Sequence, residues 1–455
     1  MNRKAIFFSL SVILILVSSN IGGTILNSSK YSLNPKNIDG SELAEVPPVE
    51  SEIKFFQDRI KANPQDGVSY TLLAGQYTRE ARETGDVANY QRAEAALKES
   101  IKLLPNYSPA KSALAAVYYA QHNFSPALEL AQQVYETNPR IIDALVTVGD
   151  AQLALGKYQE ADAAYQELDD QGDTPPVLAR LAAFEELKGN SQQALDLMSR
   201  AARDALQAGG TNESVAWYVL RVGDLYFNTG QYERAGQYYE AALRVFDNYH
   251  LALAGLGKVS AAQGKYEEAI TYYQHAIHII PQPDYLAALG DLYSVADQPQ
   301  QAQVQYKTVE YIGKLAEINR QVYNRQLAYF YSDHNLHLKE ALQLALTELE
   351  SRKDVYGYDA VAWAEYKNGS FDEAQTMMEH AMTLGTHDAR LYYHAGMIAH
   401  ALGNDEQARQ WLEQALKVNP GFSILGAAEV QKTLQELQSQ ENNWLDRLVA
   451  IVGAQ

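Results

Sequence analysis

The chain has 455 residues, no cysteine and a formal net charge of −19. The lack of cysteine excludes disulfides, thiolate metal sites and a cysteine nucleophile. The acidic balance disfavours nucleic acid or an anionic membrane surface as the main partner, because both are bound by clustered lysine and arginine.

Residues 1–26 are predicted to be a targeting segment. Arg3 and Lys4 form a short basic start, and a run of apolar or small residues follows from Ala5 to Val17. This layout is typical of a secretory signal, whereas extension of the apolar run to Leu26 would give an uncleaved membrane anchor. A buried core strand is a third reading. The first two readings place the bulk of the chain outside the cytoplasm, because the basic end stays inside.

Two short segments separate this start from the main part of the chain. Residues 27–50 are polar and aperiodic and contain three prolines, which predicts a flexible linker. Ile53, Phe56 and Ile60 recur at helical spacing, which predicts an N-terminal capping helix over 51–64. The linker would tether the rest of the chain to the N-terminal segment.

A six-residue pattern recurs along residues 65–420 and organises this part of the chain. Its versions are GKYQEA ending at Ala161, GNSQQA at Ala194, GQYERA at Ala235, GKYEEA at Ala269, GSFDEA at Ala374 and GNDEQA at Ala408. The final alanines of neighbouring versions mostly lie 33 or 34 residues apart. A fixed period of this size is typical of a solenoid of stacked units. The glycine suits a left-handed helix end, the polar residues suit the start of the next helix, and the alanine permits close helix packing.

These units resemble the tetratricopeptide repeat family, whose 34-residue helix–turn–helix unit carries small residues at its eighth and twentieth positions. The small pair appears here, for example, as Gly149 and Ala161 and as Gly223 and Ala235. Aromatic matches include Tyr165 and Tyr239. The resemblance implies an all-α fold, a right-handed α-solenoid superhelix of about ten repeats.

Some units depart from the period. The first unit is long, which predicts an extended turn over Arg79–Asn89, and kinks are predicted near 208–214 and 310–322. Residues 421–455 are predicted to form C-terminal capping helices, which a solenoid needs to cover its last repeat. The last of these would be a short helix with an apolar stripe that includes Trp444 and Leu448.

No pattern predicts catalysis, a cofactor or a metal. AGLGKVS, with Gly257 and Lys258, lacks the spacing of a phosphate loop and lies in a predicted helix. The histidine pairs lack a third ligand, so solvated or packing histidines are expected. Acidic pairs such as Glu267 and Glu268 are explained by helix starts. We therefore expect no enzyme activity.

The resemblance also implies where a partner would bind. In the family, the second, fifth, ninth and twelfth positions of each first helix line the concave face, and these positions share one side of a helix. Acidic and aromatic residues fill this stripe, which suits a segment with lysine or arginine and apolar anchors. The predicted groove residues are Asp143, Asp150, Glu186, Trp217, Asp224, Phe227, Asp284, Asp291, Tyr329, Tyr356, Asp359, Trp363, Tyr366 and Tyr393.

The leading interpretation is a non-enzymatic scaffold of the cell envelope that binds partner proteins in this groove, with the N-terminal segment engaging the membrane or the export machinery. A solvated acidic face, with aromatic residues filling gaps between units, is the structural alternative for any single residue. An extracytoplasmic glycan binder is the main functional alternative, because tyrosine and tryptophan can stack on sugar rings.

Overall fold

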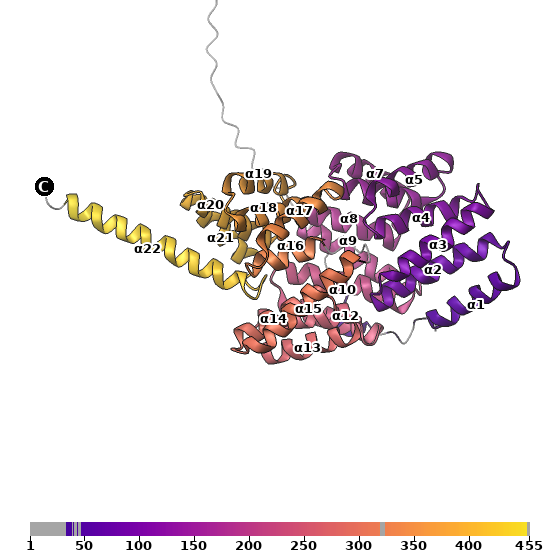
Figure 1. Cartoon of the computed structure of the whole chain (residues 1–455), viewed down its shortest axis with the longest axis horizontal. Helices are drawn as coiled ribbons and strands as arrows, with labels where there is room; N and C mark the ends of the chain where they lie inside the picture. Colours follow the sequence, from indigo (N-terminus) through magenta and orange to yellow (C-terminus); the bar gives the residue numbers. More distant parts are fainter. Residues whose placement is uncertain (1–32, 39, 41–42, 44–46, 319–323, 453–455) are drawn as a thin grey trace, which may run out of the picture. The chain divides into compact units, whose positions relative to one another are not determined.

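The computed structural model describes residues 33–452, apart from 39, 41–42, 44–46 and 319–323, and the side chains of 316–318 and 440–452 are not described. The predicted targeting segment, residues 1–26, and residues 27–32 of the predicted linker lie outside the described residues. The described part is helical and contains no strand (Figure 1). In chain order its elements are η2 (Pro35–Asn37), α1 (Val49–Ala62), α2 (Gly67–Thr84), α3 (Ala88–Leu103), α4 (Ser108–Ala120), α5 (Phe124–Thr137), α6 (Ile142–Ala154), α7 (Tyr158–Gln171), α8 (Pro175–Leu187), α9 (Ser191–Gln207), α10 (Asn212–Asn228), α11 (Tyr232–Val245), α12 (His250–Ala262), α13 (Tyr266–Ile279), α14 (Pro283–Val295), α15 (Pro299–Ile318), α16 (Asn324–Asp333), α17 (Leu338–Ser351), α18 (Val355–Asn368), α19 (Phe371–Ala381), α20 (Ala389–Ala401), α21 (Asp405–Val418) and α22 (Gly426–Val452).

From α2 to α21 the helices pack as ten successive pairs, each of which also contacts the pair that follows it. Helix α1 packs on the first pair and α22 on the last. This arrangement confirms the predicted all-α solenoid of stacked helix–turn–helix repeats.

The small residues of the repeat make room for a tyrosine on the partner helix. A Cβ added at Gly149 would lie 2.6 Å from the ring of Tyr165, and one added at Gly223 would lie 2.8 Å from the ring of Tyr239. Both rings are almost completely buried. Because a methyl group would occupy the space of the ring, glycine at this position lets the two helices of a unit approach closely.

The long units place their extra residues in helices. Helix α2 continues through Thr84, so the prediction of an extended turn over Arg79–Asn89 is wrong, because helical hydrogen bonding continues through its first half. At the predicted kink near 208–214, α9 and α10 are long helices of 17 residues each and still pack against each other. Helix α15 occupies 310–318 of the second predicted kink, and residues 319–322 lie outside the described residues.

The two ends of the described chain differ from the segments expected there. Residues 33–38 lie in the predicted flexible linker, yet the hydroxyl of Tyr238 and the guanidinium of Arg244, both on α11, donate to backbone carbonyls of Leu33 and Ile38. At the other end one helix, α22, spans most of the region predicted to hold several capping helices. The side chains of the predicted apolar stripe around Trp444 lie outside the described residues.

Later repeats lie against earlier ones along a line of backbone contacts, which we call the seam. The amide of Lys353 donates to the carbonyl of Ala154 at 2.8 Å. The Thr386 hydroxyl donates to the carbonyl of Leu187, 199 positions earlier, at 2.5 Å. The side chain of Asn419 donates to the carbonyl of Phe227, 192 positions earlier, at 2.9 Å.

The glycines of the six-residue pattern form part of the seam. A Cβ at Gly156 would lie 2.5 Å from the carbonyl oxygen of Lys353, and one at Gly189 would lie 2.5 Å from that of Gly385. At the equivalent Gly264 and Gly403, no atom of the described residues lies within 4 Å of the same point. The glycine therefore serves the helix end in the six units that carry it, and at Gly156 and Gly189 it also admits a second backbone.

Candidate functional site

The predicted groove residues all lie on the first helices of their pairs, namely α6, α8, α10, α14, α16, α18 and α20. We call the side of these helices that carries them the first-helix stripe. Charges from a distant repeat act on this stripe, since Asp388, the N-cap residue of α20, acts on Glu186 on α8, and Arg390 on α20 acts on Asp284 on α14. The fold thus brings residues of this stripe within electrostatic reach of a distant repeat, and we call the surface that these repeats share the recess.

One group of acidic residues on the stripe holds the tyrosine of its own unit. Asp150, Asp224 and Asp291 each follow a glycine, and each accepts a hydrogen bond from the tyrosine hydroxyl 15 positions later at 2.8–3.0 Å. The buried hydroxyls of Tyr165 and Tyr239 would otherwise lack a partner in the core. These three carboxylates therefore have a structural role within the repeat.

Arginines from neighbouring positions pair with the same group. Arg180 donates from Nε to both carboxylate oxygens of Asp150, at 2.9 and 3.1 Å. Arg221 donates to Asp224 at 2.7 Å and to Glu186 at 3.4 Å. Burial raises the pKa of the Glu186 carboxyl, and the charge of Arg221 opposes that rise. This part of the stripe is consequently a network of neutralised pairs.

Two other carboxylates on the stripe are accessible and have no ion pair within the described part of the chain. Asp284 begins α14 and Asp333 ends α16, and both side chains are exposed. Desolvation by the surrounding protein atoms raises the pKa of both carboxyls. The charges of Lys258 and Arg390 oppose this rise at Asp284, and the charge of His394 opposes it at Asp333. Asp143 on α6 is also exposed and lies in no ion pair between described residues.

The aromatic residues near the C-terminal end of the stripe pack against each other. Trp363 is fully buried, and its ring stacks on those of His394 at 4.0 Å and Tyr366 at 4.8 Å. Its indole nitrogen donates to Asp333 at 2.7 Å. Tyr393 is also buried beside Trp363. These rings form the packing between α18 and α20 and leave little free aromatic surface.

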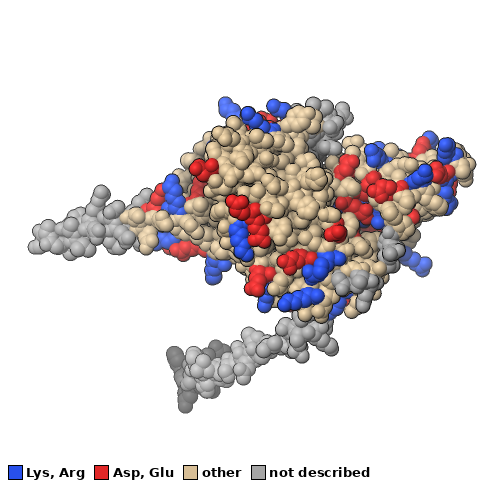
Figure 2. Space-filling model, turned by 90° about the horizontal axis from the view of Figure 1, so that it is seen from below, with Lys and Arg blue, Asp and Glu red and all other residues tan. Residues whose placement is uncertain are grey.

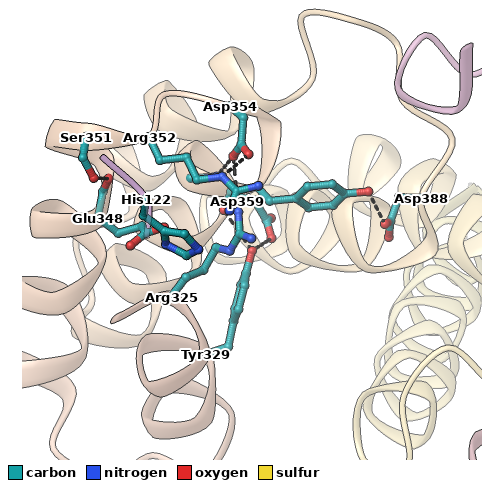
Figure 3. A network of polar contacts seen from close by, with 11 residues as sticks. His122, Arg325, Tyr329, Glu348, Ser351, Arg352, Asp354, Asp359 and Asp388 are labelled. Atoms are coloured by element: carbon teal, nitrogen blue, oxygen red, sulfur yellow. Dashed lines mark hydrogen bonds and ion pairs between the residues drawn. The ribbon is translucent and has the colours of Figure 1, made fainter. Parts of the chain in front are cut away.

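Polar contacts lock the same region around α18 (Figure 3). Tyr329 donates to Asp359 at 2.7 Å, and His394 contacts the other oxygen of this fully buried carboxylate at 2.8 Å. Burial opposes ionisation of Asp359, but the charge of His394 and the hydrogen bonds outweigh it and lower the pKa of this carboxyl. Tyr356 in turn donates to Asp388 at 3.0 Å.

The remaining predicted residues occupy intermediate environments. Trp217 is partly exposed and contacts the ring of Tyr218, whereas Phe227 is buried against Tyr232. In the described part of the chain no cluster of three or more histidine, aspartate or glutamate side chains has a geometry that could hold a metal ion.

The basic partners of the stripe were missed from sequence. Arg221 could have been found, because it lies one helical turn before Asp224. Arg180 and Arg390 could not, because their partners and neighbours come from other repeats: Arg180 reaches back to Asp150, and Arg390 lies over the ring of Tyr329 at 4.5 Å. Figure 2 shows one face of the molecule, where acidic and basic side chains are interspersed between wide uncharged areas.

Comparisons with known proteins agree with this architecture. Models of the tetratricopeptide repeat match residues 112–176, 220–285 and 389–422. The human protein O-mannosyl-transferase TMTC1 is 26% identical over 235 residues, which cover 49% of this chain and 26% of that protein. The TPR repeat-containing protein YpiA of Bacillus subtilis (strain 168) is 22% identical over 246 residues, covering 53% of this chain and 47% of that protein. The chain thus spans less than half the length of either relative.

Two solved structures also align with the chain. The crystal structure of yeast Tom70 has a TM-score of 0.36 and 12% identity, with 90% of this chain and 96% of that chain covered. The structure of BtubC from P. vanneervenii has a TM-score of 0.36 and 17% identity, with 44% of this chain and 92% of that chain covered.

Among the described helices, none has the length and apolar character needed to cross a bilayer.

Proposed function

We propose that this chain, which belongs to the tetratricopeptide repeat family, is a non-enzymatic scaffold that binds segments of partner proteins in the recess of its first-helix stripe. Stacked helical repeats present extended surfaces of the kind that protein partners use. The recess is lined by residues from many repeats, so a bound segment would contact several units at once.

The observation that carries the proposal is a pair of accessible carboxylates, Asp284 and Asp333, that form no ion pair with any residue that the structure describes. The carboxylates of Asp150 and Asp224 are already engaged by arginine and tyrosine. A lysine or arginine of a partner segment would supply a positive charge to these two carboxylates. We therefore favour an extended segment that carries basic residues.

A glycan ligand has less support. Sugar rings stack on exposed aromatic faces, but Trp363 is fully buried between Tyr366 and His394. We also place the scaffold outside the cytoplasm, held or exported by residues 1–26. That part of the proposal rests on the basic start and the apolar run of the sequence.

Binding of two labelled peptides of equal length tests the recess, one with alternating lysine and leucine and one with alternating glutamate and leucine. The lysine peptide should bind more tightly, and Asp284→Asn with Asp333→Asn should weaken it about fivefold, because each of the two exposed charge pairs is worth about 0.5 kcal/mol. Asp170→Asn on the exposed face of α7 is the control. Equal binding of both peptides, or equal effects of the two sets of variants, would refute recognition in the recess.

Location is tested separately. Residues 1–50 fused to alkaline phosphatase should give an active enzyme, because this reporter folds only outside the reducing cytoplasm. The same fusion with Arg3 and Lys4 kept and residues 5–17 deleted should be inactive. Activity of the reporter β-galactosidase in the first fusion would place the chain in the cytoplasm.

A further inference from the structure

Helix α15 carries an apolar stripe on the side that faces away from the solenoid. Ala302, Tyr306 and Val309 face inwards and pack on the neighbouring helices. On the opposite side Val304 is 60% exposed, Tyr311 61% and Leu315 40%. We call Val304, Thr308, Tyr311 and Leu315 the α15 outer stripe.

The same positions are polar or small on the other second helices. Counted from the alanine that ends the six-residue pattern, Val304 and Tyr311 lie two and nine residues on. The matching residues are Ala163 and Asp170 on α7, Thr271 and His278 on α13, Thr376 and Thr383 on α19, and Gln410 and Lys417 on α21. The repeat itself therefore does not require large apolar side chains here, and Val304 and Tyr311 are the two most exposed large apolar residues among those described.

The spacing of the outer stripe is that of a helix–helix seam. Its four residues are separated by four, three and four positions, which is the alternation of the core positions in a coiled coil. Lys307 and Lys314 lie seven residues apart at the flanking position of this pattern. Both lysines are exposed, and within the described part of the chain neither forms an ion pair. The nearby Glu310 is engaged by His337 at 3.4 Å.

We propose that the α15 outer stripe is a docking surface for an acidic amphipathic helix of a partner protein. The apolar side chains of that helix would cover Val304, Tyr311 and Leu315, and its glutamates or aspartates would pair with Lys307 and Lys314. This surface lies on a second helix, so it is distinct from the recess of the first-helix stripe, and a partner could occupy it independently.

Charge favours an acidic helix over two other candidate occupants, a second copy of this chain and an anionic membrane. An antiparallel contact between two copies would bring the flanking lysines of both stripes together, and like charges repel. An anionic membrane would meet only these two lysines on a chain of net charge −19. A helix with acidic flanks avoids the repulsion between lysines, and it needs only the local match with Lys307 and Lys314 rather than a broad basic surface.

The test uses the full chain and three labelled probes. Two are three-heptad peptides with leucine at the core positions and either glutamate or lysine at the flanking positions, and the third is a vesicle of phosphatidylglycerol. Fluorescence anisotropy at low salt should show that the glutamate peptide binds more tightly than the lysine peptide. Val304→Asp with Tyr311→Asp should weaken it at least about tenfold, since the apolar contact is lost and like charge is introduced.

Charge reversal gives a sharper result. Lys307→Glu with Lys314→Glu should reverse the preference, so that the lysine peptide binds more tightly than the glutamate peptide. Gln410→Asp with Lys417→Asp, at matching positions of α21, should leave the preference of the original chain unchanged. All substituted side chains are exposed, so circular dichroism and the thermal midpoint should stay the same and folding does not confound the result.

Three outcomes would overturn the proposal. They are equal binding of the two peptides, binding of vesicles rather than peptides, and a dimer in sedimentation that Tyr311→Asp dissociates. Loss of peptide binding in the α15 variants with intact binding by the Asp284 recess would uphold this surface alone, and the reverse would uphold the recess alone.

Discussion

Gly156 and Lys353 meet at the seam, where the carbonyl oxygen of Lys353 would lie 2.5 Å from a Cβ on Gly156. Gly156 also has a φ of 72°, in the left-handed region that favours glycine. Glycine is therefore required at this position for two reasons. The turn between its own helices needs a positive φ, and the backbone at Lys353 of a later repeat leaves no room for a side chain.

Gly156→Ala should destabilise the fold more than Gly264→Ala does. Both residues have nearly the same φ, 72° and 73°, but only Gly156 faces another backbone. The left-handed conformation alone should cost about 1 kcal/mol in each variant, and the clash should add about 1–3 kcal/mol at Gly156. Urea unfolding followed by circular dichroism measures both, and equal losses would show that the seam contributes nothing at this point.

Asn419 should be important for the seam. It is buried, donates to the carbonyl of Phe227 at 2.9 Å and accepts from Tyr232 at 2.5 Å. Asn419→Ala should cost about 2–3 kcal/mol, because buried partners lose their hydrogen bonds. Hydrogen exchange should also speed up near residues 227–232. The exposed Asn404 makes no capping bond from its side chain, so Asn404→Ala should be close to neutral. Unchanged hydrogen exchange near residues 227–232 in Asn419→Ala would show that this contact of the seam does not stabilise the earlier repeat.

The hydrogen bond between the tyrosine and the aspartate of a repeat should add to the stability that the packing of the tyrosine ring provides. Tyr239→Phe removes the hydroxyl that donates to Asp224 at 2.8 Å and should cost about 1–2 kcal/mol. In the repeat of Tyr273 the matching position is Lys258, so Tyr273→Phe should cost less. Thermal unfolding of the two variants makes the comparison, and a larger loss for Tyr273→Phe would contradict the proposed role of the aspartate.

The fold should lose stability in mild acid through His250. This side chain is buried, its Nδ1 contacts the hydroxyl of Tyr285 at 2.9 Å, and burial lowers its pKa from 6.5 to about 4. Between those two values the unfolded chain binds a proton that the folded chain does not. The free energy of unfolding should therefore fall as the pH falls from 6.5 towards 4, by up to about 1.4 kcal/mol per pH unit.

A pH series of urea unfolding measures this effect. His250→Gln should flatten the slope in that window, although it lowers stability at neutral pH. His275 is exposed on α13, so His275→Gln should leave the slope unchanged. An unaltered slope in His250→Gln would assign the acid sensitivity to other groups, such as the partly buried His122, whose pKa desolvation also lowers to about 4.

The repeat architecture could be predicted because its contacts are local. Gly223 and Tyr239 belong to one unit, and their spacing recurs, so a periodic sequence is enough to indicate which helices pair and which residues lie between them. The length of α2 was predicted incorrectly because seven surplus residues can extend a helix or a turn with little change in pattern. The acidic stripe could also be predicted, because its positions recur within each repeat. The arginines that neutralise Asp150 and Glu186 could not be predicted in the same way, because they come from neighbouring repeats.

The amino-acid sequence by itself determined that helix pairs stack, and which side of each helix carries the carboxylates. Only the tertiary structure decided that Gly189 faces Gly385, that Trp363 is enclosed, and that the outer side of α15 is left uncovered. The physical reason is that the relation between distant repeats depends on small rotations added from one unit to the next. Those rotations accumulate over nearly 200 positions, as between Leu187 and Thr386, and no local pattern records their sum.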